Sequence, residues 1–268
     1  MKGFGGQMKR IIERSTAAAG WLGFFALVLL AWMLLFLMQP GAVDSGLLQD
    51  YGSRFWSAIC APVSGQAGFW SVLFMWMLMS AAMMAPTFVP NLRTYADLGH
   101  AGAAGQAGLV ALLAGYLAIW GGFSALAAMA QLWLARAGLI GAGGASLSWG
   151  LSGALLLFAG LYQFTALKKS CLSKCRAPLM YFIGHWRGGV QGALWMGAEL
   201  GLVCLGCCWA LMLLGFVGGV MNLAWMGIAT LLMALEKLPE IGRVVTRPLG
   251  AVLVLAGVFA TLQASMGI

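Results

Sequence analysis

Three of the six cysteines lie within five residues, in the segment Gly-Leu-Val-Cys-Leu-Gly-Cys-Cys-Trp at positions 201–209. In a helix, Cys204 and Cys208 are four residues apart and point from one face, and Met212 continues that face by one more turn. Cys207 flanks this row. Thiols and thioethers are soft donors, which suit Cu(I) better than hard cations. The segment therefore predicts a soft-metal site, with the close packing of small apolar cysteines as the alternative interpretation.

An acidic residue lies shortly before these cysteines. Glu199 is the only charged residue in the long run from position 188 to position 235. A carboxylate inside a membrane is costly, so such a residue is a functional candidate by default. We therefore include Glu199 among the candidate metal ligands.

A second concentration of soft donors is the group of five methionines between positions 75 and 84. Met75, Met79 and Met83 are spaced by four residues and share one face of a helix, whereas Met77 and Met84 lie off that stripe. Thioethers bind Cu(I) and do not form disulfides. We expect the stripe to face the interior of the protein near the cysteines, with Met79 or Met83 as an additional ligand. The alternative is packing, because methionine fills irregular gaps in apolar helices.

A further pair of thiols, Cys171 and Cys175, lies in the basic segment 168–187. The pair shares one face if the segment is helical, and the neighbouring lysines favour the thiolate form. These two cysteines would then receive or supply a metal ion on the cytoplasmic side, with His185 as a distant third donor. The alternative is a solvated basic loop that faces lipid headgroups and carries reduced, idle thiols.

The composition is that of a membrane protein. Apolar residues make up 62% of the 268 residues and charged residues only 8%, whereas soluble domains carry roughly 25% charged residues. Several uncharged runs approach or exceed the roughly 20 residues that cross a bilayer as a helix. No interruption between them is long enough for a further domain. We predict an all-α fold, a polytopic transmembrane helix bundle that forms a single integral membrane domain over residues 1–268.

The hydropathy pattern divides the chain into about seven spans. Lysine and arginine gather in the amino end, the segment 168–187 and the loop 237–247. Seven spans place these three regions on the cytoplasmic side and the carboxyl end outside, in agreement with the positive-inside rule. The expected spans are 21–38, 68–86, 108–134, 147–167, 192–217, 221–235 and 249–262.

Several function classes are excluded by the sequence. The formal net charge of +8 is concentrated at the ends of spans, which indicates topology rather than nucleic-acid binding. The motif G-x-S-x-G, a phosphate-binding loop and the motif H-E-x-x-H are all absent. No hydrolase or nucleotide-binding function is predicted, and whether the chain catalyses a reaction is left open.

The motifs together resemble those of a known family. They are MWMLMSAAMMAP at 75–86, YQFTALKKSCLSKCRAP at 162–178, GLVCLGCCWALM at 201–212, GVMNLAWM at 219–226, and Glu236-Lys237. On these motifs the chain is similar to an uncharacterised bacterial family described as predicted metal-binding integral membrane proteins. The resemblance implies a multi-pass protein of the bacterial inner (cell) membrane, and the charge pattern places its amino end in the cytoplasm. Many members have a histidine before the glycine of the cysteine motif. Here that position is Leu200, so the resemblance implies another donor or weaker binding in this chain.

The leading hypothesis is a membrane protein that binds a soft transition metal, most simply Cu(I), for transport or delivery. Its ligands would come from the residues Cys204, Cys207, Cys208, Met212, Met79, Met83, Cys171, Cys175 and Glu199. A second hypothesis is a membrane thiol oxidoreductase or assembly factor. It ranks lower, because adjacent cysteines on a helix are poorly placed for an unstrained disulfide. A third is a structural membrane subunit whose small residues permit close packing. The expected partners are the lipid bilayer and either a metal chaperone or another membrane subunit.

Overall fold

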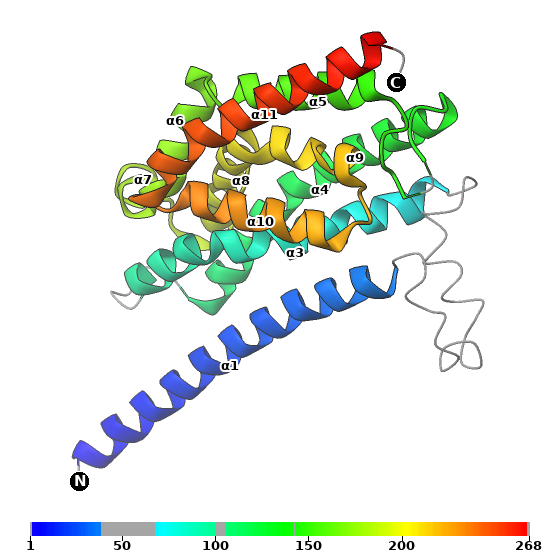
Figure 1. Ribbon diagram of the computed structural model, residues 1–268. Coiled ribbons are helices and arrows are strands. Elements are labelled where there is room, and N and C mark those ends of the chain that lie inside the picture. Colours follow the sequence, from blue (N-terminus) through cyan, green and yellow to red (C-terminus); the bar gives the residue numbers. More distant parts are fainter. Residues whose placement is uncertain (1, 39–67, 100–104, 142, 267–268) are drawn as a thin grey trace, which may run out of the picture.

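The computed structural model describes residues 2–38, 68–99, 105–141 and 143–266, and these ranges are built from helices (Figure 1). The predicted all-α class is confirmed. Within the described ranges, extended structure is limited to one isolated bridge between Ile140 and Ser146. The helices are α1 (Lys2–Leu37), α3 (Phe69–Leu98), α4 (Gln106–Arg136), α5 (Trp149–Tyr162), α6 (Ala166–Arg176), α7 (Pro178–His185), α8 (Gly189–Leu213), α9 (Gly215–Gly218), α10 (Leu223–Lys237) and α11 (Ile241–Met266).

Five of the described helices are long and apolar enough to cross a membrane. The number rises to six if α5 and α6, which are bent by 63° relative to each other, form one broken span. The expected count of seven is not confirmed. The difference lies mainly in α10, which has 15 residues, fewer than the roughly 20 that a span requires. The five spans are Gly20–Leu37, Phe69–Leu98, Gln106–Arg136, Gly189–Gly218 and Val244–Met266.

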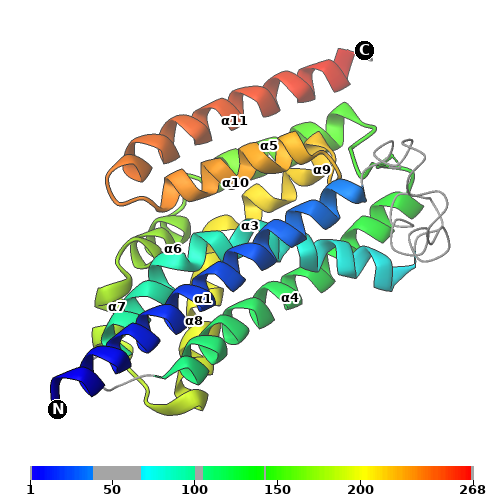
Figure 2. The same ribbon diagram turned by 90° about the horizontal axis from the view of Figure 1, so that it is seen from below.

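The helix α3 continues through Pro86 and Pro90, although the sequence predicted that this span ends at position 86. Pro86 has no N–H group to donate to the carbonyl oxygen of Ala82, four residues earlier. The indole Nε1 of Trp32 on α1 donates to that oxygen at 3.1 Å. Figures 1 and 2 show α1 alongside α3 at the outside of the bundle. A neighbouring helix thus satisfies the freed carbonyl, which is how proline is accommodated in a span that has no water to bond.

Glycines bring α4 and α8 into close contact. A Cβ atom at Gly197 on α8 would overlap the carbonyl oxygen of Leu112 on α4, and one at Gly115 on α4 would overlap the carbonyl oxygen of Leu194. Small residues of this kind let the backbones of membrane helices approach closely. The close approach places Tyr116, the residue after Gly115, beside the cysteine-bearing part of α8.

The basic segment 168–187 is largely helical, which corrects its interpretation as a loop. The side chain of Thr165 caps α6 by accepting from the backbone N–H of Lys168, and Pro178 occupies the first turn of α7. Both residue types are typical of helix starts. The concentration of lysine and arginine in the segment had instead suggested a solvated loop. Its buried face, which includes Leu172, packs α6 against α8.

Candidate metal centre

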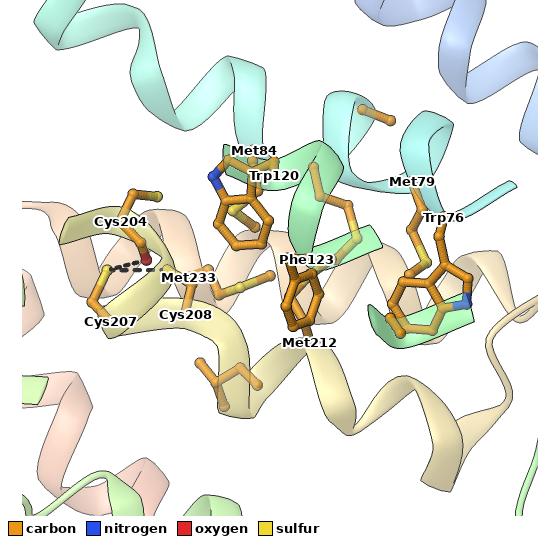
Figure 3. Packing of buried hydrophobic residues seen from close by; sticks show 14 of the residues in the cluster. Trp76, Met79, Met84, Trp120, Phe123, Cys204, Cys207, Cys208, Met212 and Met233 are labelled. Atoms are coloured by element: carbon orange, nitrogen blue, oxygen red, sulfur yellow. Dashed lines mark hydrogen bonds between the residues drawn. The ribbon is translucent and has the colours of Figure 1, made fainter. Parts of the chain in front are cut away.

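The three cysteines of α8 form one buried cluster. The sulfur atoms of Cys204, Cys207 and Cys208 all lie within 4.8 Å of one another, and their residues are 3%, 1% and 1% exposed. The Sγ atoms of Cys207 and Cys208 are 3.2 Å apart, and the Cys207 thiol also donates to the carbonyl oxygen of Cys204 at 3.1 Å (Figure 3). A cluster this compact presents three sulfur donors to a single point.

A fourth thiol comes from another helix. The Sγ atom of Cys175 on α6 lies 3.9 Å from the Sγ atom of Cys207. The hydroxyl group of Tyr162, at the end of α5, donates to the carbonyl oxygen of Gly206, the residue before Cys207 on α8. From the sequence, the pair Cys171 and Cys175 was predicted to be separate from the cysteines of α8. The fold instead places Cys175 beside the α8 cluster.

The other cysteine of α6 has a different environment. A Cβ atom at Gly206 would lie 2.7 Å from the Sγ atom of Cys171, so this sulfur sits directly against the α8 backbone. Among the described residues, the hydrogen bonds between thiols join Cys175 to Cys207 and Cys207 to Cys208, and none of them involves Cys171. Its place beside Gly206 therefore indicates packing, with the cluster one helix turn away.

Two polar side chains meet the Cys204 sulfur. The ammonium group of Lys237, the last residue of α10, lies 3.1 Å from Cys204 Sγ and donates to Thr87 Oγ1 on α3 at 2.6 Å. The hydroxyl of Tyr116 lies 3.0 Å from the same sulfur and also donates to the carbonyl oxygen of Met84. The sequence showed Lys237 at the end of a span, in the basic loop 237–247 and in the Glu236-Lys237 motif, without indicating a role at the cysteines. A lysine directly after an apolar run was the available signal, but it did not point to a cysteine 33 residues away.

A small cavity of about 10 Å³ lies where α3, α4, α6, α8 and α10 meet. Cys175, Cys204 and Lys237 line it, and so does Asn91, which is 6% exposed. The side-chain oxygen of Asn91 has no hydrogen-bond partner among the described residues. A cavity of this size has room for about one water-sized group. The cysteines, the lysine and an unsatisfied polar atom thus surround one small space.

The methionines of the stripe on α3 are interior residues, as the sequence predicted. Met75, Met79 and Met83 are 1%, 2% and 2% exposed, and Met212 on α8 is 2% exposed. Figure 3 draws Met79 beside Trp76, at the other end of the apolar cluster from the cysteines. The structure therefore buries the predicted thioethers, but it places Met79 away from the cysteines rather than near them as expected. The aromatic environment of Met79 is one in which a sulfur also makes favourable contacts.

One methionine outside the predicted stripe is equally buried. Met84 is 0% exposed, and its carbonyl oxygen accepts from the Tyr116 hydroxyl that contacts Cys204. Its backbone is therefore closely connected to the cluster. By contrast Met77, also off the stripe, is 48% exposed. Exposure thus separates the two methionines that the spacing had grouped together.

The structure does not bring Glu199 to the cysteine cluster. Its carboxylate pairs with Arg187 at 2.6 Å and accepts from the hydroxyl of Tyr181 at 2.7 Å. Burial, and next the hydrogen bond to Glu199, raises the pKa of the Tyr181 hydroxyl above its ordinary value. Tyr181 also stacks on His185, the distant donor suggested by the sequence, and these residues line an open cleft of about 480 Å³. Glu199 is a half-buried ion-pair partner at this cleft.

A buried ion pair fixes the end of α10 against α6. The Nζ atom of Lys168 lies 2.7 Å from the carboxylate of Glu236, and both side chains are 1% exposed. The guanidinium of Arg176 donates twice to the carbonyl oxygen of Glu236, at 2.9 Å and 2.7 Å. Because Lys237 follows Glu236 directly, these contacts also hold Lys237 at the cluster.

The donor set determines which ions fit. Among the described residues, the group of potential ligands within 4.8 Å of one another consists of thiols alone. A buried site of soft sulfur donors suits Cu(I) and excludes Mg²⁺ and Ca²⁺, which require oxygen ligands. Copper binding is therefore consistent with the chemistry of the cluster.

Comparison with known families agrees with this chemistry. A family model described as PpoB2, copper chaperone, matches residues 73–260, which is more than half of the chain and contains every residue of the cluster. Comparisons with the curated proteins and with the solved structures gave no match. The motifs indicated a metal-binding family, and this is confirmed. The matching family model specifies copper as the metal. The chain belongs to the PpoB2 family of copper chaperones.

Proposed function

We propose that this protein is an integral membrane protein that binds Cu(I) at its thiol cluster and passes it to a partner. The observation that carries the proposal is the meeting of Cys204, Cys207 and Cys208 with Cys175 from a second helix. Cu(I) is a soft ion that thiolates bind well. Membership in a copper chaperone family supports the choice of copper.

The four thiols differ in exposure, and the difference suggests how an ion moves. Cys175 is only partly buried, whereas the three α8 cysteines are buried. An ion held by the α8 thiols would leave or arrive through Cys175 by stepwise ligand exchange. In each step, one thiol bound to the ion is replaced by another thiol. Cys171 is not required as a ligand in this scheme. Met212, Met79 and Met83 would contribute thioether contacts along the interior, and Glu199 would act only at the neighbouring cleft.

The surroundings of the cluster support a membrane location. The apolar helices support residence in a lipid bilayer, and the clustering of lysine and arginine supports an amino end in the cytoplasm. We propose the inner membrane of a bacterium as the location. Lys237, whose ammonium group contacts Cys204, and Arg176, the residue after Cys175, belong to the basic regions for which we propose a cytoplasmic location. The partner on that side would be a metal chaperone, or another membrane subunit that receives the ion.

The test is the copper content of the protein purified in detergent under reducing conditions, followed by competition with a chromogenic Cu(I) chelator. The double variant Cys204→Ser, Cys208→Ser should lose Cu(I) binding and keep its helical content, because serine can bond back to helix carbonyls. The variant Met212→Leu should weaken binding without abolishing it. The matched control is Met77→Leu, which alters an exposed methionine. If the double serine variant retains a full equivalent of Cu(I), the cluster is packing and the proposal is wrong.

A thiol oxidoreductase or assembly factor is the second candidate. The observation that favours it is the 3.9 Å between the sulfur atoms of Cys175 and Cys207, which lie on different helices. Oxidation of this pair would link α6 to α8. Thiol trapping of membranes, with and without an oxidant, distinguishes the candidates. A Cys175–Cys207 disulfide that forms and is reduced reversibly, together with no bound copper, would replace the copper proposal by this one.

A further inference from the structure

The position of Lys237 bears on which ion the thiol cluster selects. The inference drawn from it rests on the proposed binding of Cu(I). The ammonium group contacts two side chains, Thr87 Oγ1 at 2.6 Å and Cys204 Sγ at 3.1 Å. The threonine hydroxyl orients the ammonium group and carries no charge. Of these two contacts, the sulfur is the one that becomes negatively charged when a metal binds.

Among the described residues, no carboxylate forms an ion pair with Lys237. Within the ranges that the structure describes, the ion pairs are Lys168 with Glu236 and Arg187 with Glu199. The acidic residue next to Lys237 in the chain is thus already paired with a different lysine. A buried or partly buried charge is costly unless it is paired, so an unbalanced ammonium beside a thiol cluster requires an explanation.

The charge of the occupied site provides that explanation. For any given set of thiolates, the complex of a divalent ion carries one more positive charge than the complex of a monovalent ion. The ammonium of Lys237 is attracted more strongly to the more negative, monovalent complex, so it stabilises that complex relative to the divalent one. The interaction between charges is strong at short distance in an interior from which water is excluded. Charge balance therefore favours Cu(I) over Zn²⁺, although four thiols would otherwise also suit zinc.

We propose that Lys237 is a specificity-determining residue that selects a monovalent soft ion over a divalent one at the thiol cluster. It does not ligate the ion. It approaches Cys204, which also contacts the hydroxyl of Tyr116, while Cys207 and Cys208 complete the thiol cluster. The sulfur atom of Cys204 thus belongs to the thiol cluster and also contacts the ammonium group of Lys237. Cys204 connects the metal to its counter-charge.

The placement of Lys237 is held from two directions. The Lys168–Glu236 ion pair and the bonds of Arg176 to the Glu236 carbonyl fix the end of α10. Thr87 on α3 holds the ammonium group itself. Because the ammonium group of Lys237 is already held in place, it can stabilise the bound ion without any rearrangement of its own side chain when the ion binds.

The experiment compares Cu(I) and Zn²⁺ affinities of the purified full-length protein by chelator competition. The variant Lys237→Met removes the charge and keeps most of the length, Lys237→Arg keeps the charge, and Lys174→Met is the matched control because this lysine is exposed on α6. The ratio of Cu(I) to Zn²⁺ affinity should fall by roughly tenfold in Lys237→Met, because a hydrogen bond to a charged group is worth about that factor or more. The ratio should stay within about threefold of the wild type in the other two variants.

The possible results separate this inference from the proposed function. If the wild type binds Cu(I) but Lys237→Met lowers the affinity ratio by less than about fivefold, Lys237 is not a specificity determinant and the copper function stands. An equal loss of both affinities also overturns the inference, because it shows a structural role. A fall of the ratio in Lys237→Arg as large as in Lys237→Met overturns it too. A wild type that binds no Cu(I) overturns the proposed function and this inference with it.

Discussion

Replacing Lys168 with methionine should be among the most destabilising single changes in the bundle. The Lys168–Glu236 pair is 2.7 Å long and both side chains are 1% exposed, so neither partner can turn to water when the other is removed. The second carboxylate oxygen, Glu236 Oε1, already has no hydrogen-bond partner among the described residues. Removing one partner of a buried pair costs about 3–5 kcal/mol. We expect this loss in the free energy of unfolding of Lys168→Met.

The assay is unfolding of the purified protein in mixed micelles, with sodium dodecyl sulfate as the denaturant and helical circular dichroism as the signal. The control is Arg187→Gln, which breaks the exposed Arg187–Glu199 pair and should cost about 0–1 kcal/mol. The double variant Lys168→Met, Glu236→Met should recover most of the loss, because no buried charge is left unpaired. If Lys168→Met costs no more than Arg187→Gln, or the double variant recovers nothing, the reasoning from burial is refuted.

Two further predictions test the cluster and the helix packing beneath it. Cys175→Ser should weaken Cu(I) binding by roughly tenfold in chelator competition, since one thiolate ligand is lost, while Cys171→Ser should change it little. An unchanged affinity in Cys175→Ser, or an equal loss in both variants, would contradict the assignment of Cys175 as the ligand from α6. Gly197→Ala should destabilise the protein by about 1–3 kcal/mol, because the new methyl group overlaps the carbonyl oxygen of Leu112. Its control is Gly121→Ala on α4, where a Cβ atom meets nothing within 4 Å. Equal unfolding midpoints for the two alanine variants would contradict the proposed close contact.

The sequence was sufficient for the features that repeat along one helix. Hydropathy indicated the apolar helices, and the four-residue spacing of Cys204 and Cys208 placed their sulfur atoms on one face. The same periodicity placed Met75, Met79 and Met83 in the interior, where the structure has them. These patterns are local, so they can be read without knowing which helices are neighbours.

The features that depend on other helices were not accessible in this way. Pro86 predicted the end of a span, and only the indole of Trp32 from α1 explains why the helix continues. Glu199 looked unpaired within its own run, but its partners Arg187 and Tyr181 lie on the preceding segment. The charge of Lys237 was visible as a helix end, and its contact with a thiol was not. Each error comes from a hydrogen bond or ion pair made between elements.

The division of the thiols between two helices is itself suited to delivery. Three sulfur atoms on one turn of α8 are held rigidly by the backbone, whereas Cys175 comes from α6, which is bent by 63° from α5. A chaperone must hold its ion firmly and still release it. If all ligands lie on one rigid helix, the ion cannot be released in steps. In the proposed function, a fourth thiol on a separate, partly exposed helix would provide an intermediate position between the buried cluster and a partner. The charge of Lys237, fixed by Thr87 and the end of α10, would stabilise the ion at the buried end of that exchange. Retention would thus depend on α8 and α10, and release on α6.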